Sequence, residues 1–318
     1  MAFSPAIDKE TDETIFIYGA LRSGTTVFRL MLDSHPEVSN PGEFDCIFDH
    51  LKKDAAGRWI YDLDALQMDR GFTDRSLAIG KFEDARTTAL DFVRQLRRLR
   101  PGHFTLNVHR NLEKIAALFP EAKVIHLVRD PRDVARSSIG MGWAGTTYFG
   151  INHWLETESE WNALAPRFNQ SKLMELRFED LILHPQTELR RVCQFIGVPF
   201  SPEMLNYHRR STYDAPDASA IQQWTRKQTA REVALVEFKI KNLLLERNYE
   251  LSGYPLDPPG TLEKISLRWA DKKRKWQFDC RRYGITNVLM EKVTRRLAKP
   301  AHPIFVRRIH EISRNYDK

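Results

Sequence analysis

The feature that most constrains the fold is a short apolar segment, followed at once by a glycine-bearing turn and a helical pattern. Thr14–Gly19 is rich in β-branched and aromatic residues, which is typical of a buried strand. The turn Gly19–Thr26 (GALRSGTT) comes next, and Thr25–Asp33 has the apolar spacing of a helix. The N–H groups and the dipole at a helix N-terminus attract negative charge, so this order predicts an anion-binding strand–turn–helix unit.

The side chains of this turn suit a phosphate or a similar oxyanion. Gly24 allows close approach of the backbone, the hydroxyl groups can donate hydrogen bonds, and the Arg22 guanidinium can hold two oxygens at once. The spacing from Gly19 to Gly24 matches a nucleoside-triphosphatase loop, but Thr25 stands where that loop has lysine, which disfavours ATP chemistry. The candidate anion-binding residues are Arg22, Ser23, Gly24, Thr25 and Thr26.

A second segment places a cation at the end of a strand. Lys123–Val128 is the clearest strand pattern after the first, and Arg129 follows it directly. Pro131 suits the first turn of the next helix. Ser137 then falls about two turns into that helix, where it could face back toward Arg129. Arginine and serine together predict a second phosphate site; the alternative is a salt-bridge cluster at the helix start among Arg129, Asp130, Arg132 and Asp133.

Strand and helix patterns alternate along most of the chain. Alternation of this kind predicts an α/β fold with a P-loop-like parallel sheet flanked by helices. Residues 40–80 are mixed and loop-rich. The remaining patterns predict strands over 104–108 and 172–178, and helices over 87–100, 111–119, 150–168, 186–196 and 230–246.

Charge divides the chain unevenly. Residues 261–318 hold 16 of the 49 Lys and Arg residues and 6 of the 42 Asp and Glu residues, a net charge of +10, so residues 1–260 carry −3. Pro255–Gly260 (PLDPPG) is the best boundary signal. We therefore expect a polar arm over 1–13, a domain over 14–254 and a basic, mainly helical extension over 255–318.

The basic extension predicts peripheral contact with an anionic membrane, because Trp269 and Trp276 lie among its cations. A solvated helical face is the alternative. There is no recognisable nucleic-acid-binding module, so no nucleic-acid partner is expected.

The cysteines and the N-terminus bear on location. Cys46, Cys193 and Cys280 are odd in number and far apart, which gives neither a disulfide framework nor a metal-ligand pair. The chain has no run of 18 apolar residues, and its start lacks the pattern of a secretory signal. We expect a cytoplasmic protein, with the tail at the inner face of the membrane.

Taken together, the two anion-binding segments resemble those of the sulfotransferases that use 3′-phosphoadenosine-5′-phosphosulfate (PAPS). In that family the first segment binds the 5′-phosphosulfate and the second, through the counterparts of Arg129 and Ser137, binds the 3′-phosphate. Three further segments match in order: residues 32–43 (LDSHPEV leading to Gly42-Glu43), 176–181 (LRFEDL) and 184–200 (HPQTELRRVCQFIGVPF). The resemblance covers about residues 14–254 and is strongest to the branch with the bacterial and tyrosylprotein sulfotransferases.

The resemblance implies in-line sulfuryl transfer from PAPS, which leaves 3′,5′-phosphoadenosine and needs no metal. Arg22 would act on the transferred group. Two residues compete for the role of general base. Glu43 stands where tyrosylprotein-type enzymes place a catalytic glutamate, and His109 has the spacing of the histidine base of the cytosolic small-molecule enzymes.

Residues 222–228 (QQWTRKQ) resemble a loop that closes over the nucleotide in this family. The resemblance implies that Trp224, Arg226 and Lys227 contact the adenine or the 3′-phosphate, and stacking needs only one aromatic face. The alternative is a polar surface loop.

Two departures from the family pattern bear on activity. Asn107 stands where the family usually has lysine, and no lysine lies between Lys81 and Lys114; His109 or Arg110 could supply the charge. Phe178 stands where the family usually has tyrosine. We expect a sulfotransferase for a glycan or glycolipid hydroxyl. The alternatives are a tyrosylprotein-type sulfotransferase and a nucleotide-binding or membrane-adaptor protein that has lost transfer activity.

Overall fold

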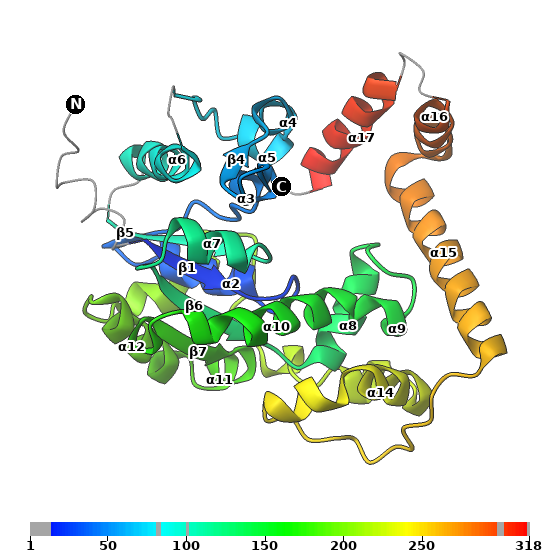
Figure 1. The fold of residues 1–318 in the computed structure, drawn as a ribbon. Helices are drawn as coiled ribbons and strands as arrows, with labels where there is room; N and C mark the ends of the chain where they lie inside the picture. The colour runs from blue at the N-terminus through cyan, green and yellow to red at the C-terminus, as the bar shows by residue number, and fades with distance from the viewer. Residues whose placement is uncertain (1–13, 81–83, 100–101, 298–301, 317–318) are drawn as a thin grey trace. The chain divides into compact units, whose positions relative to one another are not determined.

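The computed structural model describes residues 14–80, 84–99, 102–297 and 302–316 (Figure 1). The expected arm over 1–13 lies outside these ranges. The described chain forms two compact units. The first contains residues 14–130, 153–223 and 245–249, and the second contains 131–152, 224–244 and the described residues from 250 onward. The domain boundary expected after residue 254 falls within the second unit and stays a prediction.

The first unit is built on a five-stranded parallel sheet in the order β2-β5-β1-β6-β7 (Figure 1). This arrangement confirms the α/β fold class. Four of the strands match predicted patterns, whereas β2 has only two residues, too few for a pattern to reveal. The strands are β1 Ile15–Tyr18, β2 Val38–Ser39, β5 His103–Val108, β6 Lys123–Val128 and β7 Leu173–Arg177.

Helices cover both faces of this sheet because alternate residues of each strand point to opposite sides. Phe16 and Tyr18 of β1 belong to a core shared with α6, α7 and part of α10. Ile15 and Ile17 belong to a second core shared with α2, α11 and α12. The helices are α2 Thr25–Asp33, α6 Ala85–Leu99, α7 Leu112–Leu118, α10 Asn152–Leu164, α11 Phe178–Leu183 and α12 Pro185–Ile196.

The segment between β2 and α6, expected to be loop-rich, contains short elements. Buried side chains of this segment, Phe44, Phe48 and Phe72 among them, extend the core on the α6 side of the sheet. Helices of four to six residues are too short for apolar periodicity to show in a sequence. The elements are α3 Cys46–Asp49, β3 Leu51–Lys53, β4 Trp59–Tyr61, α4 Leu63–Met68 and α5 Arg70–Thr73, with β3 and β4 antiparallel.

The second unit is helical and includes the basic tail, which confirms the helical extension. Its helices are α8 Pro131–Gly140, α9 Thr147–Gly150, α13 Trp224–Lys227, most of α14 Ala230–Glu246, α15 Thr261–Tyr283, α16 Ile285–Arg296 and α17 His302–Tyr316. The loop between α8 and α9 supports α15. A Cβ on Gly142 would lie 2.1 Å from the ring of Phe278, and the Gly145 amide donates a 2.6 Å hydrogen bond to Asp271.

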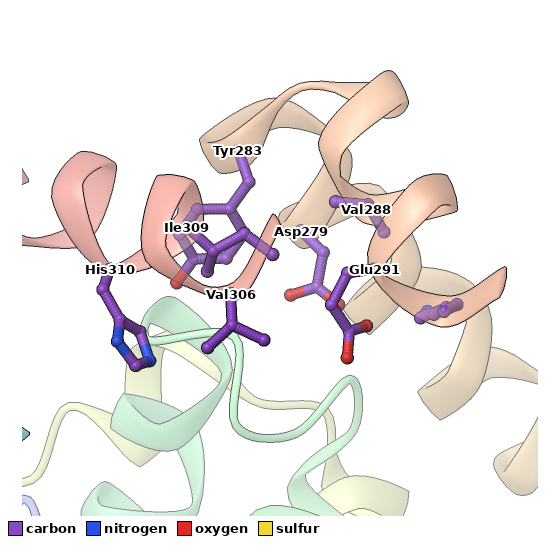
Figure 2. A pocket seen from close by; sticks show the side chains of 8 residues that line it. Asp279, Tyr283, Val288, Glu291, Val306, Ile309 and His310 are labelled. Atoms are coloured by element: carbon purple, nitrogen blue, oxygen red, sulfur yellow. The ribbon is translucent and has the colours of Figure 1, made fainter. Parts of the chain in front are cut away.

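The tail helices α15, α16 and α17 pack around a cavity of about 260 Å³ (Figure 2). Val288, Val306 and Ile309 give it apolar walls, while the carboxylates of Asp279 and Glu291 also line it. Burial raises the pKa of Asp279. The tail is therefore a packed helical layer rather than a set of separate helices.

Candidate active site

The carboxyl edge of the sheet in the first unit gathers most of the candidate residues. The turn at Gly19 follows β1, His109 follows β5, Arg129 follows β6 and Phe178 follows β7. In parallel α/β sheets, ligands bind at the edge where the strands end. The sheet order, with β1 between β5 and β6, brings these four strand ends together.

The turn after β1 is shaped by close contacts at its glycines. A Cβ on Gly19 would lie 2.5 Å from the Leu127 carbonyl oxygen, and one on Gly24 would lie 2.2 Å from the Phe178 ring. Gly24 also has φ 93°, and Arg22 has φ 73°, the left-handed region that most side chains avoid. The turn therefore curls tightly over Phe178.

The turn combines a helix start without a side-chain cap and a buried hydroxyl group. Gly24 caps α2 without a side-chain hydrogen bond, and the first turn of α2 holds no acidic residue. Ser23 is fully buried, and its hydroxyl has no hydrogen-bond partner among the described residues. A buried hydroxyl without a partner is costly, and an oxyanion in the turn would satisfy it. The turn therefore fits the phosphate or sulfate group expected there.

Arg129 braces this turn. Its Nη1 donates a 3.0 Å hydrogen bond to the Arg22 carbonyl oxygen, and its Nη2 donates one of 2.8 Å to the Ala220 carbonyl oxygen. Its guanidinium carbon lies 4.3 Å from the centre of the Phe178 ring. The Phe178 ring thus lies between Gly24 and Arg129. These contacts involve the ring alone and do not need the hydroxyl group of a tyrosine. Ser137 lies on α8, in the second unit, so its pairing with Arg129 stays a prediction.

The two rival candidates for the base form a pair. Nε2 of His109 lies 3.5 Å from Oε1 of Glu43, with the imidazole buried and the Glu43 side chain 58% exposed. Nδ1 of His109 is 2.8 Å from the Gly19 carbonyl oxygen, so it donates there and Nε2 faces Glu43. The His109 amide donates to Asp45, at 2.9 Å. This pair is therefore anchored directly to the anion-binding turn.

The surroundings shift the pKa values of this pair in opposite directions. Burial lowers the pKa of His109, but Glu43, Asp45 and the Gly19 carbonyl more than offset it, and the net pKa is raised. The contact with His109 lowers the pKa of Glu43 despite partial burial, and Arg29 and Arg75 add to the effect. Glu43 is consequently a carboxylate at neutral pH, ready to accept a proton.

Asn107, at the position of the missing lysine, joins three segments. Its Nδ2 donates a 3.2 Å hydrogen bond to the Thr25 carbonyl oxygen, and its Oδ1 accepts one of 3.0 Å from Asn40. Its backbone pairs with the segment around Glu43, accepting from Phe44 and donating to Gly42. Lysine could not accept the bond from Asn40. Asn107 therefore holds the Glu43 segment against the turn.

Two cations that the sequence reasoning missed lie beside Glu43. Arg75 donates a hydrogen bond to the Glu43 carbonyl oxygen, and another of 2.6 Å to Gly71. Arg29 has its Cδ 3.9 Å from the position of a Cβ on Gly42. Arg29 lies one helical turn after Thr25, a spacing that could have identified it. No local sequence pattern would have identified Arg75 as a residue of the site. Arg110, expected as a substitute cation, donates two hydrogen bonds to Asp49.

The other expected nucleotide contacts lie in the second unit, on the short helix α13. The Trp224 amide donates a 2.8 Å hydrogen bond to Asp133 of α8, and the guanidinium of Arg132 lies 3.9 Å from the Trp224 ring centre. Arg226 and Lys227 are exposed on the same helix. Trp224 is thus docked at the start of α8, and the nucleotide contacts stay predictions.

A cavity of about 270 Å³ lies beside the anion-binding turn and His109, within the first unit. His109 belongs to both the cavity wall and the pair with Glu43. Of this pair, His109 lines the cavity and Glu43 does not. Its lining residues are Leu21, His109, Arg110, His153, Glu156, Thr157 and Glu160. Within the described ranges, no cluster of three or more histidine, cysteine and acidic side chains could hold a metal ion.

The carboxyl edge of this parallel sheet thus combines a helix start without a side-chain cap with the contact between Glu43 and His109. The sulfotransferase family model matches residues 14–202, and the chain belongs to the sulfotransferase family. This confirms the family expected from the motifs.

Curated relatives and solved structures agree with the family. Protein-tyrosine sulfotransferase 1 of Danio rerio is 29% identical over 220 residues, 64% of this chain and 58% of the relative. Protein-tyrosine sulfotransferase A of Caenorhabditis elegans is 28% identical over 218 residues, 63% and 53% of the two chains. The chain thus spans little more than half the length of these relatives.

Two solved domains share the fold. The sulfotransferase domain from the curacin biosynthetic pathway superposes with a TM-score of 0.53 at 21% identity, covering 74% of this chain and 98% of that one. The sulfotransferase domain from the Synechococcus PCC 7002 olefin synthase superposes with a TM-score of 0.56 at 18% identity, covering 75% of this chain and 95% of that one. At these identities the likeness concerns the fold alone.

Proposed function

We propose that this protein transfers the sulfuryl group of PAPS to a hydroxyl acceptor by in-line displacement. The observation that carries the proposal is the Glu43–His109 pair, anchored through the Gly19 carbonyl to a turn whose buried Ser23 hydroxyl has no partner among the described residues. The turn fits the 5′-phosphosulfate of PAPS because its helix N-terminus carries no side-chain cap. Membership of the sulfotransferase family supports the same reaction.

The chain's own residues divide the chemistry between them. When bound, PAPS supplies a sulfuryl group whose bond to the phosphate oxygen breaks as the acceptor oxygen bonds to sulfur, with the electron pair leaving on 3′,5′-phosphoadenosine. Glu43 removes the acceptor proton, and His109 holds the carboxylate in place. Arg22 and the amides of the turn neutralise the charge that gathers on the leaving phosphate, so no metal is called for.

Positive charge beside the acceptor comes from residues other than Asn107, whose amide is engaged with Asn40 and Thr25. Arg29 and Arg75 are close enough to Glu43 to lower its pKa. We propose that Arg29 and Arg75 supply the positive charge that the lysine supplies in other family members.

The acceptor is a hydroxyl group of a glycan, a glycolipid or a tyrosyl residue. The relatives named protein-tyrosine sulfotransferase favour the tyrosyl acceptor. The cavity at His109 does not by itself distinguish a tyrosyl hydroxyl from a sugar hydroxyl. The third reading is an adaptor that binds the nucleotide without transfer. Incubating the protein with radiolabelled PAPS and an extract of the source organism would separate the three. Binding of 3′,5′-phosphoadenosine with no labelled product would support the adaptor.

Replacing Arg129 by methionine should weaken binding of 3′,5′-phosphoadenosine by about 100-fold, because the two charge-assisted hydrogen bonds that we assign between this arginine and the 3′-phosphate are lost. We assign this arginine to the 3′-phosphate, so 5′-AMP, which lacks that group, should lose less affinity: only the part that comes from bracing the turn. Isothermal titration calorimetry with both nucleotides would measure the two affinities. The matched control is Glu43→Gln, for which neither affinity should change more than about threefold. Equal losses for Arg129→Met and Glu43→Gln would refute the division of roles.

We further propose that the tail docks on an anionic lipid bilayer. No helix in the described ranges has both the length and the apolar composition to cross a bilayer. Leu262, Ile265 and Trp269 of α15 are 82%, 46% and 72% exposed, at spacings of three and four residues, so they share one helix face. Lys272 and Lys273 continue along it, exposed.

This face of α15 points away from the rest of the second unit. Asp271, Arg274 and Phe278 make the contacts with the loop that holds Gly142 and Gly145. At about 100° per residue, those side chains lie roughly opposite to the exposed apolar face. Apolar side chains next to exposed cations suit the boundary between lipid tails and anionic headgroups.

Exchanging both cations on this face, Lys272→Glu with Lys273→Glu, should reduce binding to vesicles that contain phosphatidylserine by about tenfold or more, since each cation contributes about 1 kcal/mol there. Cosedimentation with the vesicles would measure the fraction of protein bound. The control is Arg98→Glu with Lys241→Glu, which alters the net charge equally at exposed sites elsewhere. Equal loss in both variants, or equal binding to pure phosphatidylcholine vesicles, would exclude docking by this face.

A further inference from the structure

The cavity beside His109 takes one wall from a single face of α10. His153, Glu156, Thr157 and Glu160 line it, at spacings of three, four and seven residues that place them on one side of the helix. The adjacent side of α10 is buried: Trp154, Glu158 and Trp161 lie there, and Trp161 stacks on His126 with ring centres 4.0 Å apart. The helix cannot rotate without exposing that core, so the polar face is fixed toward the cavity.

The orientation of this wall is reinforced from the sheet. The Tyr18 hydroxyl, with one proton to donate, lies 2.7 Å from the Glu160 carboxylate and 3.2 Å from the Thr157 carbonyl oxygen. The Thr157 hydroxyl donates a 3.1 Å hydrogen bond to the His109 carbonyl oxygen. The carboxylate of Glu160 is thereby held at the cavity by strand β1, and the helix is tied to the residue that contacts Glu43.

The cavity wall carries two carboxylates, while its Arg110 and His109 each face a carboxylate outside the wall. Glu156 and Glu160 contribute two carboxylates. Arg110 is the cation on the other side, but Asp49 neutralises it through bonds of 2.8 Å and 2.5 Å. His109 also lines the cavity, but the Glu43 carboxylate lies 3.5 Å from its Nε2. An anionic acceptor would therefore meet repulsion in this cavity, whereas a cationic one would be attracted.

We infer that this cavity selects acceptors that carry a protonated amine near the hydroxyl group to be sulfated, and that Glu156 and Glu160 are the residues that set this preference. The inference rests on the proposed sulfotransferase function. Neutral acceptors are used less well and acceptors bearing a carboxylate least, because the carboxylates of α10 attract an ammonium group and repel another carboxylate. The amine stays unmodified, and the hydroxyl group loses its proton to Glu43.

Three phenols of similar size test the inference: tyramine, 4-ethylphenol and 3-(4-hydroxyphenyl)propionate. A matching set of sugars, the methyl glycosides of glucosamine, glucose and glucuronic acid, covers non-aromatic acceptors. With radiolabelled PAPS, kcat/KM should fall in the order cation, neutral, anion, and the cation should exceed the anion by about 10- to 100-fold. In Glu156→Gln with Glu160→Gln the ratio should shrink to about threefold, while glutamine still accepts the bond from Tyr18.

The control is Glu113→Gln, an exposed carboxylate on α7 that pairs with Lys53, which should leave the charge order as it is. Turnover without the charge order, or an order that survives the double variant, would overturn the inference and leave the proposed function standing. No turnover of any probe by protein that binds 3′,5′-phosphoadenosine would overturn both.

Discussion

Replacing Glu43 by glutamine should lower kcat by about 10²- to 10⁴-fold, the usual contribution of a general base. Glutamine has nearly the same shape, so the Asn107 contacts to this segment should persist and nucleotide affinity should hold. Steady-state kinetics with PAPS and an accepted hydroxyl compound would measure the loss. A fall in kcat of less than about fivefold would move the role of base to His109.

The same substitution should also be visible in the titration of His109. Glu43 raises the pKa of this imidazole, so Glu43→Gln should lower it, as NMR of the histidine Cε1 proton would record. The stabilisation from the raised pKa is complete below about pH 6.5, the ordinary value, and is lost as pH rises through the folded-state pKa. The lowered pKa of Glu43 stabilises the fold above about pH 4.3, and this stabilisation is lost as pH falls.

The stability gap between the native protein and Glu43→Gln should therefore be widest between about pH 4.3 and 6.5, and narrow on either side. Urea unfolding at a series of pH values would give this profile. A gap that widens steadily above pH 7 would contradict the assigned directions of the two shifts.

Replacing Gly24 by alanine should destabilise the fold by about 2–5 kcal/mol and abolish nucleotide binding. Two costs add. A left-handed φ of 93° costs an L-residue about 1–2 kcal/mol. The new Cβ would also fall 2.2 Å from the Phe178 ring, and overpacking of a core costs about 1–3 kcal/mol. Urea unfolding and calorimetry with 3′,5′-phosphoadenosine would measure the two effects.

Gly57 offers a matched control for that substitution. Its φ of 78° is also left-handed, but a Cβ there would have no atom within 4 Å. Gly57→Ala should therefore show the backbone cost alone, about 1–2 kcal/mol, with nucleotide affinity unchanged. If both alanine variants lose the same stability, the contact between the turn and Phe178 is looser than the structure has it.

Local patterns were enough to predict the main elements. The span Thr25–Asp33 was predicted as the structure has it, because apolar spacing and the glycine turn both mark its start. Strand Lys123–Val128 was also predicted to the residue, since a run of buried aliphatic residues ends at a charged one. By contrast, β2 and the hairpin β3–β4 were missed because two or three residues hold too little pattern.

The site was predicted in its parts but not in its connections. Glu43 and His109 were each singled out as rival bases, whereas their contact depends on the parallel pairing of the Glu43 segment with β5. The role of Asn107 depends on the hydrogen bond that the Asn40 side chain donates to it. The role of Arg75 depends on a loop that folds back and places its guanidinium at the Glu43 carbonyl oxygen. Such relations between distant residues arise from tertiary packing, which no local pattern encodes.

The hydrogen bonds of Asn107 have a consequence for how this scaffold can diversify. Asn107 of β5 bonds to the Glu43 segment through its backbone, and to Asn40 and the Thr25 carbonyl through its side chain. The separation between Glu43 and the turn is therefore set by the sheet rather than by a loop. The short helices α3 to α5 and the polar face of α10 can then change sequence, and with it acceptor preference, without retuning the chemistry. In the proposed mechanism, the transfer centre and the acceptor wall are then separate parts of the site that meet at His109.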